Sequence, residues 1–519
     1  MAGSSCVIRR ALLSVWDKTG ICELAAGLHE MGVKLIASGG TARSIRQAGL
    51  PVMEVSQLTG FPEILDGRVK TLHPKIFGGL LALDTPEHRL EMEREGLWYI
   101  DLVAVNLYPF REVAWQRRAE LDEALEHIDI GGSALLRAAA KNFPRVVVLS
   151  SPEQYQPVLE ELRSRGDLTA DTRRRLAWAA FRHSSIYDAW VTAYLGMGKL
   201  NPQEPVEGDG ELLMVGARSQ VLPYGENPHQ KAALYLLPGC PPGALSRAQL
   251  LAGRPLSYNN YLDAAAALAL VVQYEEPAAV AIKHASPCGC AVATELSSAF
   301  RACRDADPVS IFGGVVAVNR EVDEDTARGM REVHLDLVVA PGYSPSALQL
   351  LKRRRRLRVL RVTLPQPTAA ELRTIPGGLL LQEPDAARVD PTRWQLVTSR
   401  KPTEDELADA VFAWRVVRVA RSNAVVVARG RVTLGIGAGQ PSRISAARLA
   451  LAQAGERARG AVMASDGFLP FPDVVQAAAA AGVTCLVQPG GSVRDEESVA
   501  AAEQAGLSML FTGVRHFRH

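Results

Sequence analysis

Short apolar runs alternate with amphipathic segments along the whole chain. Up to about residue 200, apolar runs at residues 10–15, 33–37 and 146–149 predict buried β-strands. Ile21, Leu24, Ala25 and Leu28 recur with the period of a helix, and further helices are predicted from residue 152 and over residues 171–195. This alternation predicts an α/β fold in which helices wind on both faces of a parallel sheet.

The second part of the chain repeats the alternation. Continuous apolar runs at residues 278–282, 314–318, 337–340, 424–428 and 483–487 predict central strands. Ala-rich helices are predicted between them, for example over residues 264–272 and 474–481. Segments 281–287 and 463–470 echo each other, because each is a strand that ends in a small polar loop with a proline. This echo predicts two similar halves in the second part.

A boundary is predicted between the two parts. Residues 201–210 are rich in Pro, Glu and Gly, which is typical of a linker. We therefore expect one domain at residues 1–200 and another at residues 201–519. A chain of 519 residues is long enough for two or more domains.

The composition is that of an ordinary globular protein, with 47% hydrophobic and 22% charged residues. The net charge of +2 predicts no strong attraction to nucleic acid or to a membrane. No apolar run approaches the roughly 20 residues that a bilayer requires, and we expect no signal peptide. The seven cysteines are mostly scattered and odd in number, which favours reduced thiols in the cytoplasm over a disulfide framework.

The most basic run, at residues 352–358, does not predict nucleic-acid binding. Nucleic-acid binding would require interleaved aromatic residues and a basic fold, and neither is present. The run therefore predicts a solvated helix end before a strand at residues 357–362.

The first candidate site combines a basic segment with a turn of small residues. The segment at residues 67–79 contains no acid and four basic residues, Arg68, Lys70, His73 and Lys75. A basic loop is often only solvated. Upstream, however, the predicted strand at residues 33–37 runs into Ser-Gly-Gly-Thr (38–41) and then a helix, a junction that points backbone N–H groups at an anion. Together these segments predict a phosphate site.

A second candidate site follows the predicted strand at residues 278–282, which ends in Lys283 and His284. α/β proteins bind ligands at this edge of the sheet. A lone Lys-His pair is more often structural, but two other segments support a site. The loop at residues 224–230 is densely polar, and residues 435–443 form a glycine-rich turn that ends in Arg443 and suits close approach to a phosphate.

A zinc site is the alternative for this segment, since His284, Cys288 and Cys290 are possible ligands. Zinc-dependent deaminases combine His-x-Glu with a separate Pro-Cys-x-x-Cys motif. Here no Glu stands two residues after His284, and the cysteines have the spacing Cys-x-Cys. The pattern favours a site without metal.

Motifs along essentially the whole chain resemble, in matching order, those of one family. They include Ser-Val-Trp-Asp-Lys-Thr-Gly (14–20), Ser-Gly-Gly-Thr (38–41), Gly-Arg-Val-Lys-Thr-Leu-His-Pro (67–74), Asn-Leu-Tyr-Pro-Phe (106–110), Ile-Asp-Ile-Gly-Gly (128–132) and Arg-His-Phe-Arg-His (515–519). The family is the bifunctional phosphoribosylaminoimidazolecarboxamide (AICAR) formyltransferase and IMP cyclohydrolase of purine biosynthesis.

The resemblance implies a methylglyoxal-synthase-like core at about residues 1–150 and a formyltransferase domain of two cytidine-deaminase-like subdomains. It implies the last two steps of IMP synthesis. A formyl group passes from 10-formyltetrahydrofolate to the 5-amino group of AICAR, and the product then closes its ring with loss of water. It also implies no catalytic metal, nucleotide and folate as small-molecule partners, and a homodimer.

For ring closure, the resemblance implies Lys141 as proton donor and acceptor and Lys70 as the stabilising cation, with Asp129 and Tyr108 as groups that orient the substrate and relay protons. On their own, Lys141 reads as a solvated helix end and Asp129 as a helix N-cap. The implied nucleotide-binding positions are Ser14, Trp16, Asp17, Lys18, Ser38, Gly39, Gly40, Thr41, Arg68, Val69, Lys70, Thr71, Val105, Asn106, Asp129 and Ile130.

Formyl transfer needs a base for the weakly nucleophilic amine and a cation for the developing oxyanion. His284 suits the base, Lys283 the cation, and Asn423 the orientation of the substrate, and these are the family's motif positions. The implied AICAR contacts are Tyr224, His229, Gly313, Asp336, Asn423 and Arg443. The implied folate contacts are Ile444, Phe468, Asp473, Gly490, Gly491 and Phe517, although Phe468 alone would be read as core.

Two other functions stay open at this stage. A methylglyoxal-synthase-like enzyme, or a nucleotide-binding regulatory protein with an inactive second domain, explains the residues up to about 200. It does not explain Lys283, His284 or the segment at residues 435–443. A scaffold of inactive domains would tolerate the loss of charged site residues, and nearly all of them are present.

One position departs from the family pattern. The family usually has Arg before Tyr-Gly-x-Asn-Pro-His, whereas this chain has Pro223. The variant Pro223→Arg should bind nucleotide more tightly at the transferase site, because it restores a cation for phosphate or carboxamide. Equilibrium titration with AICAR measures the effect, and an unchanged or weaker dissociation constant would contradict the prediction.

Overall fold

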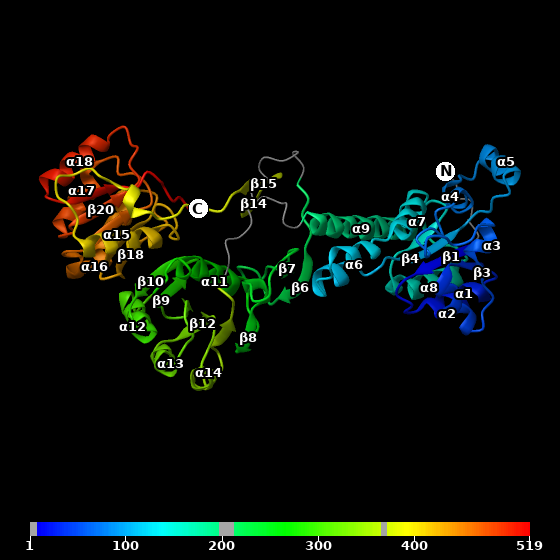
Figure 1. Cartoon of the computed structure of the whole chain (residues 1–519), viewed down its shortest axis with the longest axis horizontal. Helices are drawn as coiled ribbons and strands as arrows, with labels where there is room; N and C mark the ends of the chain where they lie inside the picture. The colour runs from blue at the N-terminus through cyan, green and yellow to red at the C-terminus, as the bar shows by residue number, and fades with distance from the viewer. Residues whose placement is uncertain (1–7, 197–211, 365–370) are drawn as a thin grey trace. The chain divides into compact units, whose positions relative to one another are not determined.

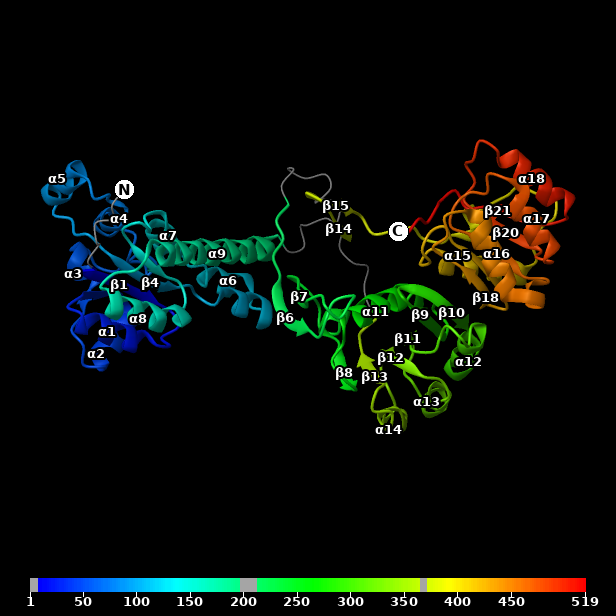
Figure 2. The same ribbon diagram turned by 180° about the vertical axis from the view of Figure 1, so that it is seen from behind.

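The computed structural model describes residues 8–196, 212–364 and 371–519 (Figure 1, and from behind in Figure 2). The chain forms two compact units, one of residues 1–200 with 212–215 and the other of residues 201–211 with 216–519. The predicted linker at residues 201–210 lies outside the described residues. Each unit is built around its own principal sheet.

The first unit contains a five-stranded sheet in the order β3-β2-β1-β4-β5, with every neighbouring pair parallel. The strands are β1 (Arg10–Val15), β2 (Lys34–Ala37), β3 (Met53–Glu54), β4 (Leu102–Asn106) and β5 (Val147–Leu149). Every residue of β4 and β5 is buried, and all of them are apolar except Asn106 at the end of β4. The predicted parallel sheet is confirmed, although β3 and β4 were not among the predicted strands.

Helices cover both faces of this sheet (Figure 1). On one side α1 (Ile21–Glu30) contacts α2 (Gly39–Gln47) and α8 (Tyr155–Arg165), whereas α7 (Ile130–Lys141) and α9 (Ala170–Leu195) pack on each other and on β5. The other helices are α3 (Val55–Thr59), α4 (Pro74–Leu81), α5 (Pro86–Arg94) and α6 (Leu121–Glu126). Because α4 begins at Pro74, the basic segment at residues 67–79 is a loop only in its first half.

The second unit contains one twelve-stranded sheet in the order β16-β21-β20-β19-β17-β18-β10-β9-β11-β12-β13-β8. In chain order these are β8 (Gln249–Ala252), β9 (Ala278–Lys283), β10 (Ser286–Val292), β11 (Gly314–Val318), β12 (Leu335–Ala340), β13 (Arg358–Arg361), β16 (Gln395–Leu396), β17 (Val425–Arg429), β18 (Val432–Gly437), β19 (Val462–Ser465), β20 (Cys485–Gln488) and β21 (Ser508–Phe511).

The sheet consists of two halves with the same topology. In each half an antiparallel hairpin is followed by three mutually parallel strands, the first of them antiparallel to the hairpin, and by an antiparallel edge strand. The halves meet where β10 pairs with β18 at Ala291 and Val432, and one hydrophobic core includes residues of both. The prediction of two halves is confirmed. The sequence echo that suggested them is wrong, because it matches β9 with β19, whereas the topology matches β9 with β17.

The helices of the second unit repeat in the same way. They are α11 (Tyr258–Val271), α12 (Leu296–Ala306), α13 (Glu324–Arg331) and α14 (Pro345–Lys352) in one half, and α15 (Glu404–Val417), α16 (Arg443–Ala454), α17 (Pro472–Ala480) and α18 (Asp495–Gln504) in the other. Two separate hairpins complete the unit, β6 (Ala217–Leu222) with β7 (Ala232–Leu236), and β14 (Glu371–Ile375) with β15 (Gly378–Gln382). Within the described ranges, no helix has the length and apolar character to cross a membrane.

The basic run at residues 352–358 does follow a helix, since α14 ends at Lys352. It is only partly solvated, however. Arg354 donates hydrogen bonds to the carbonyls of Val333 (2.7 Å) and Arg331, and Arg358 pairs with Asp336 at 2.6 Å. These two arginines therefore hold loops and strands together.

A buried ion pair connects β1, β4 and the start of β5. The Asp101 carboxylate accepts hydrogen bonds from the N–H groups of Arg9 (2.9 Å) and Arg10 (3.0 Å) and pairs with Arg145 at 3.0 Å. The Arg145 guanidinium also donates to the carbonyls of Gly79 (2.5 Å) and Ile100 (3.0 Å). The pair is thus fully hydrogen-bonded, which is the condition for burying charge.

Removal of this cation should destabilise the first unit. The variant Arg145→Met leaves the Asp101 carboxylate buried without its partner, so we expect the free energy of unfolding to fall by about 3–5 kcal/mol. Hydrogen exchange of the β1 and β4 amides in urea measures this. The control Arg163→Met breaks an exposed pair with Glu30 and should cost less than about 1 kcal/mol. Equal effects of the two variants would contradict the prediction.

Candidate functional site

The candidate site of the first unit lies where β1, β2 and β4 end. The hydroxyl oxygens of Ser14 and Ser38 are 2.8 Å apart. Thr41 accepts a hydrogen bond from the Val15 N–H (3.2 Å) and donates one to the Val15 carbonyl (3.1 Å). These contacts fix the turn at residues 38–41 against the end of β1.

Asn106, the last residue of β4, holds the loop that follows β1. Its Oδ1 accepts hydrogen bonds from the N–H groups of Trp16 (2.6 Å) and Asp17 (2.9 Å), and its Nδ2 donates to the Asp17 carbonyl (2.9 Å). The Asp17 carboxylate accepts from Thr19, which lowers the pKa of Asp17. The side chain of Asn106 is therefore occupied in shaping the loop.

The turn at residues 38–41 starts α2. Ser38 is the N-cap residue with an extended backbone, and its side chain does not cap the helix. Gly39 has φ 31°, and a Cβ at Gly40 would stand 3.9 Å from Cε of Lys18. Helix N-termini attract anions through their first N–H groups and the helix dipole. With a lysine beside it, this turn fits a phosphate.

Lys18, which lies beside this turn, is within electrostatic reach of Lys70. Lys18 donates hydrogen bonds to the carbonyls of Val15 and Trp16, the latter at 3.1 Å. Burial, and then the charge of Lys70, lower the pKa of Lys18. Ammonium groups that repel each other in this way are stabilised by an anion that binds between them.

Acids from outside the basic segment partly neutralise it. Arg68 pairs with Glu126 of α6, and both side chains are more than half exposed. Such a pair contributes little stability, so it leaves the guanidinium available to a ligand. Glu63 also approaches, since its Oε2 would lie 3.7 Å from a Cβ placed at Gly67.

Asp129 is the N-cap residue of α7 and faces the same edge. Its Oδ1 accepts a hydrogen bond from the Gly132 N–H at 2.6 Å, and the Tyr108 N–H also bonds to the carboxylate. Burial raises the pKa of Asp129, although these hydrogen bonds and the charge of Lys70 oppose the rise. The carboxylate therefore caps a helix and stands within electrostatic reach of Lys70.

Aromatic rings surround Asp129. The ring of Trp16 contacts Tyr108 (5.1 Å between centroids) and His127 (6.3 Å), both edge to face. The hydroxyl of Tyr187, from α9, accepts from the Asp129 N–H (2.8 Å) and donates to the His127 carbonyl (2.6 Å). The sequence analysis missed Tyr187, because a tyrosine at helical spacing reads only as core.

The other predicted residues of this site are scattered around the same edge. Thr71 and Val105 are buried, and Gly131 approaches Thr71 so closely that a Cβ would lie 3.0 Å from Oγ1. Val69 forms an isolated bridge with Ile64, and Ile130 is 63% exposed.

Lys141 is not brought to this edge. It is the last residue of α7, whereas Asp129 precedes the first, and a 12-residue helix is about 18 Å long. The neighbouring Asn142 donates to the carbonyls of Leu80 (2.7 Å) and Ala82 (3.0 Å), far from Thr71 at the opposite end of α4. Within one chain, Lys141 and Asp129 therefore stand at opposite ends of α7.

In the second unit, Lys283 and His284 stand at the turn between β9 and β10. The Lys283 Nζ donates to the Phe312 carbonyl at 2.8 Å and would lie 3.2 Å from a Cβ at Gly313. His284 and Ala285 both have left-handed φ values, 52° and 59°. The structure therefore brings together Lys283, His284 and Gly313 of the predicted set.

Two aspartates accompany this turn. Asp263, on α11, accepts a hydrogen bond from the Ala285 N–H at 2.7 Å, and burial raises the pKa of Asp263. The sequence analysis missed this residue. The predicted Asp336 receives hydrogen bonds from Asn260 (2.7 Å) and Arg358 (2.6 Å), so its carboxylate is already paired.

A second cluster lies in the other half of the unit, around Arg443 at the start of α16. The guanidinium pairs with the fully buried Asp466 and donates to Oδ1 of Asn423 at 2.7 Å. The Arg443 Cζ lies 6.0 Å from the centre of the Phe517 ring. Asn423 itself donates to the Gln440 carbonyl at 2.8 Å. Arg443 and Asn423 are thus brought together, as predicted.

The glycine-rich stretch before Arg443 serves packing. Gly435 and Gly437 lie in β18, and a Cβ on either would come within 1.9 and 2.0 Å of the carbonyl oxygens of Ala450 and Ala446. They therefore allow α16 to lie directly on the sheet. Only Gly439, with φ 67°, belongs to the turn. The expectation that this whole stretch approaches a phosphate is corrected.

The predicted folate positions occupy loops and helix starts of this half. The rings of Phe468 and Phe517 are 36% and 41% exposed. Gly490 has φ 72° and packs against Phe511, and the Gly491 N–H donates to Asp495 at 2.7 Å. Ile444 is partly buried on the core, and Asp473 lies in the first turn of α17.

Among the described residues 212–364 and 371–519, the group of Lys283 and His284 is not connected to the group of Arg443 and Asn423. No hydrogen bond, ion pair or ring contact within these ranges joins the two. The polar loop of Tyr224 and His229 is closed by a hydrogen bond from the Gly225 N–H to the Gln230 carbonyl (2.7 Å), and its Glu226 carbonyl accepts one from Asn259 of α11 (3.1 Å). The transferase residues therefore form separate groups in one chain.

The alternative zinc ligands are poorly suited to a metal. Cys288 donates to the Ala281 carbonyl, and Cys290 is fully buried beside Tyr274. Burial raises the pKa of each thiol to about 12, so both are protonated at neutral pH. In the described parts of the chain, no group of three His, Cys, Asp or Glu side chains is arranged to hold a metal ion.

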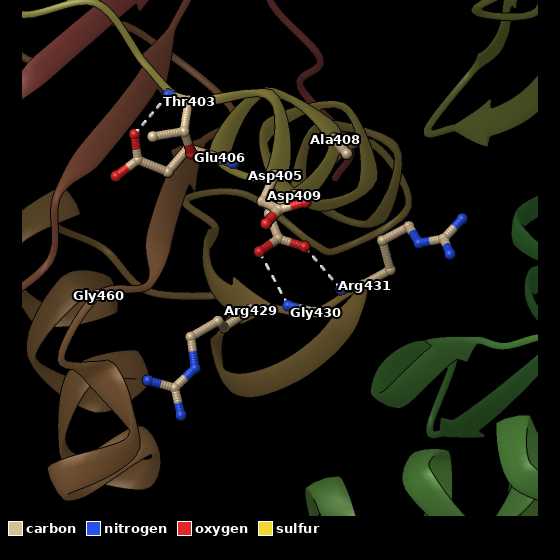
Figure 3. Close-up of a pocket in the computed structure, with 9 residues that line it drawn as sticks. All are labelled: Thr403, Asp405, Glu406, Ala408, Asp409, Arg429, Gly430, Arg431 and Gly460. Carbon is tan, nitrogen blue, oxygen red and sulfur yellow. Dashed lines mark hydrogen bonds between the residues drawn. The ribbon is translucent and has the colours of Figure 1, made fainter.

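A pocket of about 520 Å³ lies beside the turn between β17 and β18 (Figure 3). Its lining includes Thr403, Asp409, Arg429, Gly430 and Arg431, and none of the predicted site residues. Asp409 accepts hydrogen bonds from the N–H groups of Gly430 (2.8 Å) and Arg431 (2.6 Å). The pocket thus surrounds a turn whose polar groups are already paired.

A helix N-terminus with a lysine beside it in one unit, and a Lys-His turn in the other, fit an enzyme that acts on phosphorylated small molecules. Residues 20–134 match the model of the MGS-like domain, and residues 139–453 match that of the AICARFT/IMPCHase bienzyme. The chain therefore belongs to the AICARFT/IMPCHase bienzyme family, as the resemblance predicted. It is an AICAR formyltransferase and IMP cyclohydrolase.

Full-length relatives agree with the family models. A "Bifunctional purine biosynthesis protein PurH" of Bacillus thuringiensis (strain Al Hakam) is 46% identical, and one of Anoxybacillus flavithermus (strain DSM 21510 / WK1) is 47% identical. Each match covers 98% of this chain and 100% of the relative. A solved structure described as "Crystal structure of ForH" is 41% identical, with a TM-score of 0.33, over 36% of this chain and 97% of its own.

Nucleotide binding should change the protonation of Lys18. The pKa of Lys18 is lowered in the free protein, and a phosphate dianion would raise it again. At alkaline pH, IMP binding should therefore take up protons, and the uptake should shrink as the pH is lowered and Lys18 becomes protonated in the free protein. Calorimetry in two buffers of different ionisation enthalpy measures the uptake. The variant Lys18→Met should abolish it, and uptake that persists in this variant would contradict the prediction.

Proposed function

We propose that ring closure takes place at the sheet edge of the first unit and formyl transfer at the Lys283–His284 turn of the second. The observation that carries the first assignment is the helix N-terminus at residues 38–41, with Lys18 beside Gly40 and Lys70 within electrostatic reach of Lys18. This arrangement binds the phosphate of the nucleotide and leaves Asp129 to face its base. We propose that the cyclohydrolase domain comprises residues 1–200 and the formyltransferase domain residues 201–519.

For ring closure, the carboxamide nitrogen of the formylated nucleotide attacks the formyl carbon, and water is then lost. The attack places negative charge on the former formyl oxygen, and Lys70 is proposed to stabilise it. Asp129 accepts the proton that the carboxamide nitrogen loses, since a carboxylate of raised pKa is a better base than a solvated one. Tyr108 orients the heterocycle with Trp16, against which its ring packs.

For formyl transfer, the family implies a folate one-carbon donor, and we propose that it is 10-formyltetrahydrofolate. The amine of AICAR attacks the formyl carbon, the bond from that carbon to N10 of the folate breaks, and tetrahydrofolate leaves with a proton. His284 accepts the amine proton, and Lys283 stabilises the developing oxyanion. The exposed rings of Phe468 and Phe517 offer a flat apolar wall for the pterin.

We propose that two copies of the chain complete each transferase site. The separation of Lys283 and His284 from Asn423 and Arg443 supports this assignment. Amine orientation by Asn423 and phosphate binding by Arg443 would then come from the second copy. The described cysteines are free thiols, which supports a place in the cytoplasm.

The two steps should be separable by mutation. We expect His284→Ala to abolish formyl transfer while ring closure of supplied formylated nucleotide persists, because the residues lie in different units. Asp129→Asn should do the reverse. Formation of tetrahydrofolate and of IMP, measured apart, gives the two rates. Loss of ring closure in His284→Ala would refute the assignment of two sites.

Lys141→Ala provides a further arm of the same experiment. From the geometry of a single chain, we expect ring closure to be nearly unchanged, because Lys141 stands at the far end of α7. A loss as large as that of Asp129→Asn would show instead that Lys141 of a second copy reaches the site.

A further inference from the structure

We propose that Asp263 is a positioning residue for formyl transfer, whose carboxylate holds the His284–Ala285 turn in the conformation that presents His284. The contact is the hydrogen bond from the Ala285 N–H to Oδ1 of Asp263, at 2.7 Å. Asp263 belongs to α11, which packs on β9. The inference rests on the proposed role of His284.

The His284–Ala285 turn needs a contact that holds it, because its backbone conformation is unfavourable. Because Lys283 pairs directly with Ser286, His284 and Ala285 are the two central residues of a tight hairpin. Both have left-handed φ values, 52° and 59°. Hairpins of this kind favour glycine or asparagine, since a Cβ makes the left-handed conformation unfavourable. Two residues with side chains therefore occupy a turn that neither prefers.

The other half of the same unit shows what this turn requires for folding alone. Its counterpart lies between β17 and β18, where Arg429 pairs with Val432 and the central residues are Gly430 (φ 62°) and Arg431 (φ 55°). Asp409 accepts the N–H groups of both central residues, at 2.8 and 2.6 Å (Figure 3). A carboxylate from the preceding long helix thus holds the turn in each half.

The two aspartates are equivalent in position. α11 and α15 are both 14 residues long and begin with a capping box, at Ser257 and Thr403. Asp263 and Asp409 are each the sixth residue of their helix. A helix aspartate that holds a hairpin turn is therefore present in both halves. The first central residue of the turn is His284 in one half and Gly430 in the other.

The comparison of the two turns shows which features folding requires and which it does not. Gly430 satisfies the turn without a side chain, so folding alone gives no reason for a histidine at the equivalent position. An unfavourable backbone conformation persists at functional sites when surrounding contacts enforce it. Asp263 supplies that contact, and it lies within electrostatic reach of both His284 and Lys283. By fixing the turn, it keeps the imidazole where the amine proton is to be removed.

The experiment compares Asp263→Ala, Asp263→Asn and the matched control Asp409→Ala in the full-length enzyme. We expect Asp263→Ala to lower kcat for formyl transfer about tenfold or more, because a displacement of an ångström at a reacting group can cost on the order of 100-fold. Ring closure should be unchanged. Asp263→Asn retains an oxygen that accepts the Ala285 N–H and should recover most of the rate. Asp409→Ala should lower the melting temperature by a similar amount without a comparable loss of formyl transfer.

Other outcomes would overturn the inference. Asp263→Asn as slow as Asp263→Ala would show that the charge, and not the hydrogen bond, is needed. Equal losses of formyl transfer in Asp263→Ala and Asp409→Ala, or loss of both activities, would show that Asp263 only stabilises the fold. A fully active His284→Ala would instead refute the proposed function, which keeps the two failures distinct.

Discussion

The carboxyl end of a buried strand is the constraint on which both candidate sites depend. Within a central strand, the backbone groups are paired with the neighbouring strands, and the side chains on both faces are covered. The first residues past the end are the earliest that can face a ligand. Ser38 and Asn106 follow or end strands of the first unit, and Lys283 ends β9 of the second. The sheets therefore determine where polar chemistry can be placed.

Many polar side chains at these edges form hydrogen bonds within the protein. Asn106 is fully engaged with the loop after β1, and Arg443 is shared between Asp466 and Asn423. Such contacts fix side chains before a ligand arrives, which reduces the entropy lost on binding. A residue that belongs to a family motif can therefore act by shaping the site instead of by touching substrate.

The sequence predicted the structure best where a single local pattern determines the element. Continuous apolar runs predicted β1, β9 and β11 closely, because a strand buried on both faces must be apolar throughout. Family motifs supplied the class of reaction and most candidate residues. What could not be predicted depends on contacts between distant segments. Tyr187 meets Asp129 across 58 residues.

The sequence echo failed for a related reason. A strand followed by small polar residues and a proline is too common a pattern to identify equivalent segments. The true equivalence rests on the spacing from the helix caps Ser257 and Thr403 to Asp263 and Asp409, which is six residues in each case. That spacing is visible in the sequence, but it acquires meaning only when the hairpin turns that the two aspartates hold are known.

The symmetric order of strands in the second unit has a further consequence. Each half is a complete six-stranded layer with the same connections, and the two layers join through a single pairing of β10 with β18 at Ala291 and Val432. Hydrogen bonds between Cys290 and Thr433 secure this junction. Because each half carries its own hairpin turn, one turn can keep glycine for folding alone while the other carries a histidine.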